Sequence, residues 1–586
     1  MGSRARWFVS LFVLTFMVVG GWYVFSLLRT DQIREDLNVD VPMRDGVNLA
    51  TDIYRPDEEG RFPVILVRTP YKKEKFERIA RSYARRGYVA AVQDCRGRFA
   101  SGGTWEPWIN EPKDGYDTIE WLAGQRWSNG KVGMIGESYA GSVQWWAARQ
   151  RPPHLVTIIP NCFSTDPFYN YPYEYGVLFM LDTFNWVVGL ETGEDLSGDL
   201  RPLPVIDLDK SILGRENHYW RKWLEHPVED EHWEPANFLV HLEDVRIPVF
   251  HQSGWFDGNG TKLNYLRMAS HGHPHQKLIL GPWGHTPYAS RRVGDIDFGP
   301  EAAIDLQKEY LRWCDYWLKG EDNGILNEPL VRVFAMGSNK WLEGNTYPLE
   351  RTRFEKWYIS SGGSANTSGG DGRLSPEVPS DDSPPDRYTY DPGDPTPAPS
   401  CLNIPESNRY LGKGPEDLDL RQAYHEKIAG SRGDILVYTS EPLTGELTIA
   451  GPIEGLLYAS SSCRDTDWFM RLTEVDKEGR MFELVEGKIR ARYRRSTKKA
   501  VFLNPGEVYE YNIDMWQTGI TVPAGHRLRV EVASASFPVF SRNLNTGRHN
   551  EKDTDYIPAE QTIYHNAKYP SHVLLPVIPD ADEPKP

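Results

Sequence analysis

A serine lies where an apolar run of the sequence meets a helical stretch. Residues 132–141 have the sequence VGMIGESYAG, and SVQWWAARQ follows, so Ser138 would stand between a buried strand and a helix. This arrangement is typical of a nucleophile elbow, in which the hydroxyl projects above the sheet and only small neighbours fit. Gly136 and Ala140 occupy the neighbouring positions. Because Ala140 departs from the strict G-x-S-x-G form, a purely structural turn stays open on this motif alone.

An acid and a base follow the serine in the order that an α/β-hydrolase requires. Asp257 comes directly after IPVFHQSGWF, and His285 comes directly after KLILGPWG, each at the end of an apolar run. In this chemistry His285 would take the proton of Ser138, and Asp257 would fix the imidazole tautomer. Taken singly, Asp257 could cap a turn and His285 could lie in a surface loop. The three residues in this order favour a catalytic triad.

The reaction also needs hydrogen-bond donors for the negative oxygen of a tetrahedral intermediate. The backbone N–H of Tyr139 is the predicted donor, since it follows the nucleophile directly. The alternating histidines His271, His273 and His275 lack a nearby acidic residue or cysteine, so a solvated loop is favoured over a metal site. We therefore predict no metal and no cofactor.

The segments around these residues alternate between strand and helix. PVILVRTPY, YVAAVQDCRG and KVGMIG are apolar runs suited to buried strands, and ERIARSYARRG and GYDTIEWLAGQ between them have helical spacing. This order predicts the α/β class with a parallel sheet, here an α/β-hydrolase fold. We expect a first part of the core at residues 40–162, a helical cap at 163–244 and a second part at 245–350.

The remainder, residues 351–586, is predicted to be a linker followed by a β-sandwich. The stretch after Trp357 is rich in Gly, Ser, Pro and Asp and is interpreted as a domain connector. Beyond it, DILVYTS, DWFMRLTEVD, RLRVEVASASFPVF and HVLLPVI are short β-rich runs separated by turn residues. Their spacing is typical of an antiparallel sandwich.

The N-terminus carries an apolar segment without charges at residues 7–28, preceded by Arg4 and Arg6. At about 1.5 Å per residue it is long enough for the ~30 Å hydrocarbon core of a bilayer. We therefore expect residues 1–30 to be a signal anchor with the catalytic part outside the cytoplasm; a cleaved signal peptide and a secreted protein are the alternative. The sequon Asn259-Gly260-Thr261 lies beside Asp257, where a glycan would obstruct the site, which suggests a bacterial envelope.

Bulk composition limits the partners. The formal net charge is −16, and no basic stripe runs along the sequence, so a nucleic-acid partner is excluded. Five scattered cysteines do not indicate a disulfide framework. We expect a small ester or amide as substrate and a membrane contact through the N-terminal helix; the oligomeric state, a homo-oligomer included, stays open.

Several motifs together resemble the CocE/NonD family of hydrolases, which includes relatives of cocaine esterase and X-prolyl dipeptidyl peptidases. They are RTPY at 68–71, QDCRGR at 93–98, GESYAG at 136–141, GWFD at 254–257, GPWGH at 281–285 and, more weakly, ILVYTS at 435–440. The resemblance covers the chain from about residue 40 to the C-terminus. It implies that the sandwich is a jelly roll and that the hydroxyl of Tyr71 is the second oxyanion donor.

The sequence therefore predicts a serine hydrolase that forms an acyl-enzyme on Ser138, with an esterase or acylase as the favoured activity. An X-prolyl dipeptidyl peptidase is the alternative within the same chemistry. The alternative in a different class is an envelope binding protein whose hydrolase domain is inert.

Overall fold

The chain divides into two compact units. The computed structural model describes residues 33–162, 166–192, 198–257, 260–285, 289–294, 296–399 and 428–579. The first unit comprises the described residues up to Asn161, together with Asp244–Phe250 and Glu309–Ile325; the second comprises Cys162–Glu243, His251–Lys308 and the residues from Leu326 onward. Each unit is described by itself below.

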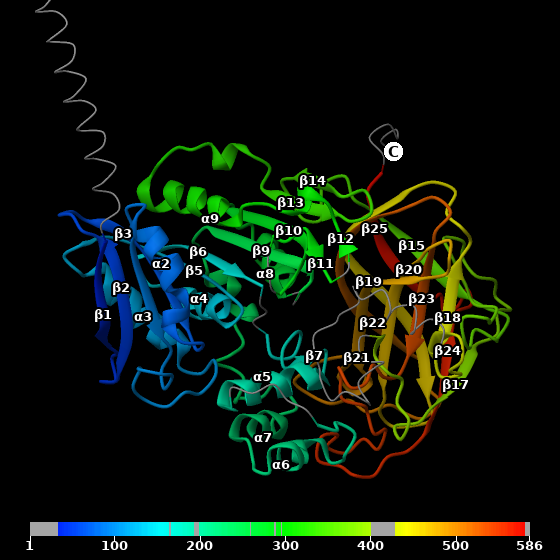
Figure 1. The fold of residues 1–586 in the computed structure, drawn as a ribbon. Helices are drawn as coiled ribbons and strands as arrows, with labels where there is room; N and C mark the ends of the chain where they lie inside the picture. The colour runs from blue at the N-terminus through cyan, green and yellow to red at the C-terminus, as the bar shows by residue number, and fades with distance from the viewer. Residues whose placement is uncertain are drawn as a thin grey trace, which may run out of the picture. The chain divides into compact units, whose positions relative to one another are not determined.

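The first unit contains a mostly parallel sheet with helices against it (Figure 1). In spatial order its strands are β1 (Ile33–Pro42), β2 (Asn48–Pro56), β4 (Val89–Asp94), β3 (Phe62–Thr69), β5 (Ser128–Glu137) and β6 (Leu155–Asn161). The helices of this unit include α2 (Glu77–Ala84), α3 (Glu111–Ala123) and α4 (Tyr139–Arg149). The β1–β2 hairpin and the β2–β4 pair are antiparallel, whereas β4, β3, β5 and β6 pair in parallel. The α/β-hydrolase class that the sequence predicts is thus confirmed.

The second unit begins with the cap and the rest of the hydrolase strands. The cap holds β7 (Tyr173–Glu174), β8 (Val177–Leu178), α5 (Met180–Thr192), α6 (Leu208–Leu213) and α7 (His218–Glu225). The hydrolase strands are β9 (Val249–Phe256, which starts in the first unit), β10 (Gln276–Gly284), β13 (Val331–Ala335) and β14 (Lys340–Gly344). Helix α8 (Gly260–Ser270) follows β9, and a short hairpin of β11 (Arg292–Val293) and β12 (Ile296–Asp297) follows β10. Helix α9 (Leu306–Cys314) begins in this unit and continues into the first unit from Glu309. The helical cap expected at residues 163–244 thus also contains a short β-hairpin.

The C-terminal β domain, residues 353–579, is a largely antiparallel sheet that folds around an apolar interior. Its strands in spatial order are β17 (Asp386–Tyr390), β24 (Ala559–Tyr564), β19 (Leu447–Ser461), β25 (His572–Val577), β15 (Arg353–Ser360), β16 (Arg373–Ser375), β18 (Leu436–Ser440), β23 (Arg527–Ala533), β20 (Asp467–Val475) and β21 (Met481–Arg490); β22 (Tyr509–Val522) pairs with β19. One apolar cluster runs from β10 and β13 into this domain and includes Leu280, Val333, Leu457 and Val530, all fully buried. The β domain therefore shares its core with the hydrolase strands of its unit.

The polar stretch after Trp357, expected to be a connector, instead belongs to the β domain. It supplies β16 and β17, and β17 pairs with β24. Within β17, Tyr388 and Tyr390 are buried while Arg387 and Thr389 are exposed. This alternation with a period of two is the pattern of a half-buried strand. The prediction of a connector was wrong here because Gly, Ser and Pro residues, which favour turns, surround these five residues.

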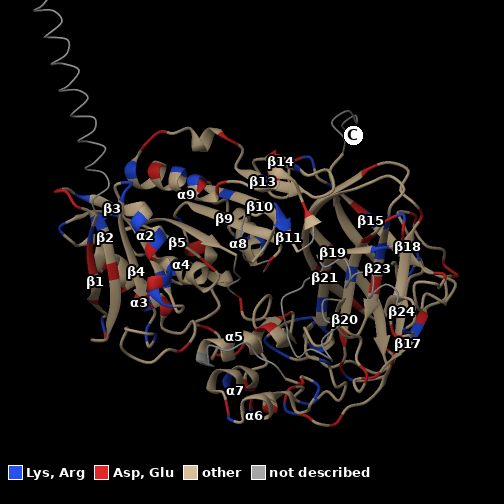
Figure 2. Cartoon of the chain, viewed as in Figure 1, with Lys and Arg blue, Asp and Glu red and all other residues tan. Residues whose placement is uncertain are grey.

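Charges of both signs are interspersed along the helices and strands (Figure 2). None of the helices that the structure describes combines the length and the apolar character needed to cross a membrane. The predicted anchor at residues 7–28 lies outside the described residues.

Buried ion pairs fasten the cap to the β domain. Lys488 on β21 donates to Glu174 on β7 with 2.6 Å between Nζ and Oε2, and both side chains are almost fully buried. The hydroxyl of Tyr175 donates to Asp514 on β22 at 2.6 Å, and Lys262 on α8 donates to the same carboxylate at 2.7 Å. Burial raises the pKa of Glu174, and the Lys488 ammonium opposes that shift. Charges so deeply buried are tolerated because each has a partner of opposite sign.

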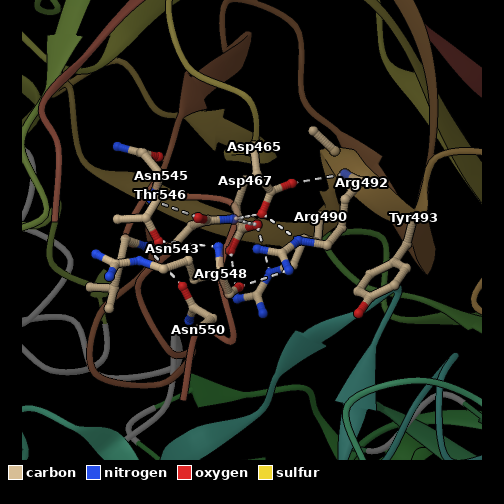
Figure 3. Close-up of polar contacts among 12 residues, drawn as sticks. Asp465, Asp467, Arg490, Arg492, Tyr493, Asn543, Asn545, Thr546, Arg548 and Asn550 are labelled. Carbon is tan, nitrogen blue, oxygen red and sulfur yellow. Dashed lines mark hydrogen bonds and ion pairs between the residues drawn. The ribbon is translucent and has the colours of Figure 1, made fainter. Parts of the chain in front are cut away.

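A second buried cluster extends this attachment (Figure 3). Arg490, at the end of β21, donates to both carboxylate oxygens of Asp467 at 3.0 and 3.1 Å and to Glu551 at 3.1 Å. The amide of Asn543 donates to Asp467 at 2.7 Å. The backbone carbonyl of Glu551 accepts from the N–H of Ile206 in the cap at 2.9 Å. The cap is therefore attached to the β domain at more than one place.

Replacing Lys488 by Met should destabilise the second unit, because the Glu174 carboxylate stays buried without its partner. Breaking a buried pair in this way costs about 3–5 kcal/mol in the free energy of unfolding. The measurement is the urea midpoint of the purified protein, followed by circular dichroism.

Arg480→Met is the matched control, because Arg480 pairs with Asp476 on the exposed turn between β20 and β21. Exposed pairs contribute little, so its urea midpoint should equal that of the wild type. The double variant Glu174→Leu/Lys488→Met should recover part of the loss, since no charge is then left unpaired. Equal midpoints for Lys488→Met and Arg480→Met would contradict a stabilising role for the pair.

Candidate active site

Ser138 stands at a sharp turn between β5 and α4. The strand ends at Glu137, the helix begins at Tyr139, and Ser138 has φ 56° and ψ −128°. A residue with a side chain rarely adopts this conformation, which costs on the order of 1–3 kcal/mol and is usual at functional sites. The backbone holds the turn, since the Ser138 N–H donates to the carbonyl of Asn161 and the Ser138 carbonyl accepts from Gly141. The predicted strand–turn–helix context of the nucleophile is present.

Close packing explains the small residues around the serine. Gly136 has φ 151°, and a Cβ there would lie 2.8 Å from both the Cβ and the carbonyl oxygen of Ala140. A Cβ on Gly141 would lie 2.7 Å from the carbonyl oxygen of Asn161 on β6. Backbone atoms cannot move aside as a flexible side chain can. Both glycines are therefore required for the helix to approach the sheet so closely, and Ala140 fits although it departs from the strict motif.

Tyr71 lies beside the proposed nucleophile. It follows the end of β3, and its hydroxyl oxygen is 3.5 Å from Oγ of Ser138. The backbone N–H of Tyr71 donates to the Thr69 hydroxyl at 3.0 Å, which fixes the start of the loop. The backbone N–H of Tyr139 belongs to the first residue of α4, where helical N–H groups lack partners within the helix. A phenol and a helix N-terminus are thus both present at the serine.

Asp257 and His285 form a hydrogen-bonded pair in the second unit. Asp257 follows β9 directly, His285 follows β10 directly, and Nδ1 of His285 lies 2.7 Å from Oδ1 of Asp257. The carboxylate is 2% exposed, whereas the imidazole is 48% exposed. A buried carboxylate on Nδ1 holds the ring in one tautomer, so proton exchange with another group falls to Nε2.

His251, a second histidine near the β9 and β10 strands, is unsuited to exchange protons with a substrate or a serine. His251 on β9 is buried, and its Nε2 contacts the side-chain oxygen of Gln276 at 2.9 Å. Burial lowers the pKa of His251 to about 3. His251 therefore packs within the core, and of these two histidines only His285 has an accessible imidazole.

Asp182 on α5 is an acidic residue that the sequence did not single out. Its side chain is open to solvent, yet protein atoms crowd it at longer range, which raises the pKa of its carboxyl. Asp257 raises the pKa further, and His285 opposes the shift. These electrostatic effects indicate that Asp182, a residue of the cap, lies near the Asp257–His285 pair.

The structure brings the predicted residues together in two groups. Ser138, Tyr139 and Tyr71 form one group in the first unit, and Asp257 and His285 form the other in the second unit. The Tyr71 hydroxyl contacts Oγ of Ser138 in the first group, and Nδ1 of His285 contacts Oδ1 of Asp257 in the second. Convergence of the two groups on one substrate is part of the function proposed below.

Comparison with known proteins agrees with these motifs over nearly the whole chain. Residues 45–287 match the family described as X-Pro dipeptidyl-peptidase (S15 family), and residues 323–574 match its C-terminal non-catalytic domain. A cocaine esterase from Rhodococcus sp. (strain MB1 Bresler) is 33% identical over 92% of this chain and 98% of its own length.

Two solved structures share the fold. An aminopeptidase from the marine sediment archaeon Thaumarchaeota archaeon superimposes with a TM-score of 0.81 at 25% identity, over 94% of this chain and 96% of that one. An α-amino acid ester hydrolase superimposes with a TM-score of 0.79 at 24% identity, over 94% of this chain and 97% of that one. Because of the similarity to cocaine esterase and the two matched domains, the chain belongs to the CocE/NonD family of hydrolases and is an enzyme.

Proposed function

We propose that this hydrolase cleaves a carboxylic ester or amide by forming an acyl-enzyme on Ser138. The observation that carries the proposal is the contact of 3.5 Å between the Tyr71 hydroxyl and Oγ of Ser138 at a strained strand-to-helix turn. A hydrogen-bond donor beside a strained hydroxyl is what a reaction with a developing oxyanion requires. The His285–Asp257 pair, with its buried carboxylate and accessible ring, supports the same chemistry.

In the acylation step, Oγ of Ser138 attacks the substrate carbonyl carbon while its proton passes to Nε2 of His285. The carbonyl oxygen becomes an oxyanion, which accepts hydrogen bonds from the Tyr71 hydroxyl and the Tyr139 N–H. Asp257 stabilises the imidazolium through Nδ1. When the C–O or C–N bond of the substrate breaks, His285 returns the proton to the leaving alcohol or amine, and the acyl group stays on Ser138.

Deacylation repeats these steps with water in place of the serine. His285 takes a proton from water, the hydroxide oxygen attacks the acyl carbon, and the same two donors stabilise the second oxyanion. Collapse of this intermediate returns the proton to Oγ of Ser138 and releases the carboxylic acid. The cycle uses no cofactor.

An esterase is favoured over a peptidase because the cocaine esterase similarity extends over 98% of that enzyme. The family description of residues 45–287 supports an X-Pro dipeptidyl peptidase as the second candidate. Hydrolysis of Ala-Pro-nitroanilide with a higher kcat/KM than that of simple acyl esters would favour the second candidate.

Ser138→Ala should lower kcat by about 10³- to 10⁶-fold, because the hydroxyl itself forms the covalent bond. A fluorophosphonate probe should label the wild type stoichiometrically and should not label this variant. The measurements are ester turnover and labelling detected by intact-protein mass spectrometry.

Ser82→Ala on α2 is the control, since Ser82 lies on a helix surface and contacts Arg86. It should retain the labelling and the turnover of the wild type. Wild-type turnover by the Ser138 variant, or a wild type that reacts neither with the probe nor with an ester panel, would refute the proposed mechanism.

Tyr71→Phe should lower kcat by about 10²- to 10³-fold, the typical loss when one oxyanion donor is removed, with a much smaller change in KM. The control is Tyr83→Phe on α2, because the Tyr83 hydroxyl is buried without a hydrogen-bond partner. Steady-state kinetics on one ester separates the two variants. A Tyr71→Phe enzyme with the kcat of the control would remove Tyr71 from the oxyanion hole.

For location, we propose that residues 7–28 anchor the enzyme in a bacterial membrane with the catalytic part outside the cytoplasm. The support is the length of the uncharged apolar segment. The full-length protein should remain with membranes after a carbonate wash, and deletion of residues 1–30 should release it. A soluble mature protein whose N-terminus lies beyond this segment would instead indicate a cleaved signal peptide.

A further inference from the structure

A fully buried ion pair joins β3 to α3 in the first unit. The Arg68 guanidinium at the end of β3 is completely buried, and its Nη1 lies 2.8 Å from Oε2 of Glu111, the first residue of α3. Nε of Arg68 donates to the side-chain oxygen of Gln93 on β4 at 2.8 Å. Asp114, one turn further along α3, contributes a second carboxylate 3.9 Å from Arg68. One charge therefore connects two strands of the sheet to the start of a helix.

The carboxylate of Glu111 also contacts Tyr139, the residue after Ser138. Its Oε1 accepts from the Tyr139 hydroxyl at 3.1 Å, and that hydroxyl in turn accepts from the backbone N–H of Trp108 at 2.9 Å. The Tyr139 ring is fully buried and contacts the rings of Trp105 and Trp146. The first residue of α4 is thus held through its side chain.

Burial and the opposite charge of the partner shift the pKa of each member of the Arg68–Glu111 pair in opposite directions. Burial alone would lower the pKa of Arg68, but Glu111 and Asp114 offset that effect, so its pKa is raised. Burial raises the pKa of Glu111, and the Arg68 guanidinium opposes the shift. The 2.8 Å contact between Nη1 of Arg68 and Oε2 of Glu111 offsets part of the cost of burying both groups.

We infer that Arg68, Glu111 and the Tyr139 side chain form a positioning network that fixes both donors of the oxyanion hole. Arg68 precedes Tyr71 by three residues at the end of β3, and Tyr139 supplies the second donor from its own backbone. The network therefore sets the spacing between the phenol of Tyr71 and the N–H of Tyr139. A misplacement of about 1 Å at such a site can cost 10²-fold in rate, so the network acts on the transition state rather than on substrate binding.

The inference rests on the proposed function, and Tyr139→Phe tests it with the smallest change. The variant keeps the ring between Trp105 and Trp146 and removes only the hydroxyl that Glu111 and Trp108 hold. We expect kcat for an ester to fall about 10- to 100-fold while KM changes less than about 3-fold. The affinity for a boronic acid that mimics the tetrahedral intermediate should fall by the same factor as kcat/KM.

Two further variants make the result specific. Tyr83→Phe removes another buried tyrosine hydroxyl of the first unit and should leave kcat, KM and boronic acid affinity unchanged. Glu111→Gln keeps an oxygen that can accept from Tyr139 but removes the charge, so its kcat should lie between those of the wild type and Tyr139→Phe. The thermal midpoints of all three variants show whether they are folded at the assay temperature.

The outcomes separate this inference from the proposed function. A wild type without Ser138-dependent hydrolysis overturns both. An active wild type together with a Tyr139→Phe enzyme that matches Tyr83→Phe overturns the positioning network alone. The same holds if the loss is confined to KM, or if the thermal midpoint falls while kcat and boronic acid affinity stay at wild-type values. Should Tyr139→Phe not fold, a Glu111→Gln enzyme with wild-type kcat and boronic acid affinity overturns the network as well.

Discussion

The buried charge of Arg68 is a strong constraint on how the first unit can fold. A guanidinium without solvent is very costly unless carboxylates and hydrogen bonds replace its hydration. Glu111 and Gln93 provide these contacts, and they come from the start of α3 and from β4. Because the cost of an unpaired charge is so large, β3, β4 and α3 cannot shift independently. The loop with Tyr71 begins at the end of β3, which Arg68 holds in place. The turn with Ser138 is connected to Glu111 through the hydroxyl of Tyr139.

A comparable constraint acts on the acid and the base in the second unit. Trp255 lies two residues before Asp257 and donates from its indole N–H to the carbonyl of Phe334 at 2.8 Å. Gly519 of the β domain lies against both, since a Cβ there would be 2.3 Å from that carbonyl and 2.7 Å from the Trp255 ring. The end of β9 is thus packed directly on the backbone of the C-terminal domain. This domain therefore supports the Asp257–His285 pair as well as the cap.

Much of this organisation could be predicted from the sequence, and the exceptions have physical causes. The strands that lead to Ser138, Asp257 and His285 are largely apolar, so the local sequence pattern predicts their positions and their type. The sequence does not predict β17 in the same way, because its alternation of buried and exposed residues covers only five residues and is surrounded by turn-forming residues. Glu111 and Asp182 are ordinary acidic residues in helical stretches, and only the fold brings them near a buried arginine or the Asp257–His285 pair.

Arg68 illustrates why sequence motifs under-report such roles. In the sequence it is simply the first residue of the RTPY motif, which ends in the proposed oxyanion donor, because long-range pairing leaves no local signal. The four residues before it on β3, Val64–Val67, are apolar and buried, so a charged residue there conflicts with the strand pattern. A conflict of this kind in an otherwise consistent strand is expected at functional sites, where stability is exchanged for geometry. An arginine inside a buried strand should therefore direct attention to the carboxylate that neutralises it, and here that carboxylate accepts a hydrogen bond from Tyr139, the residue next to the proposed nucleophile.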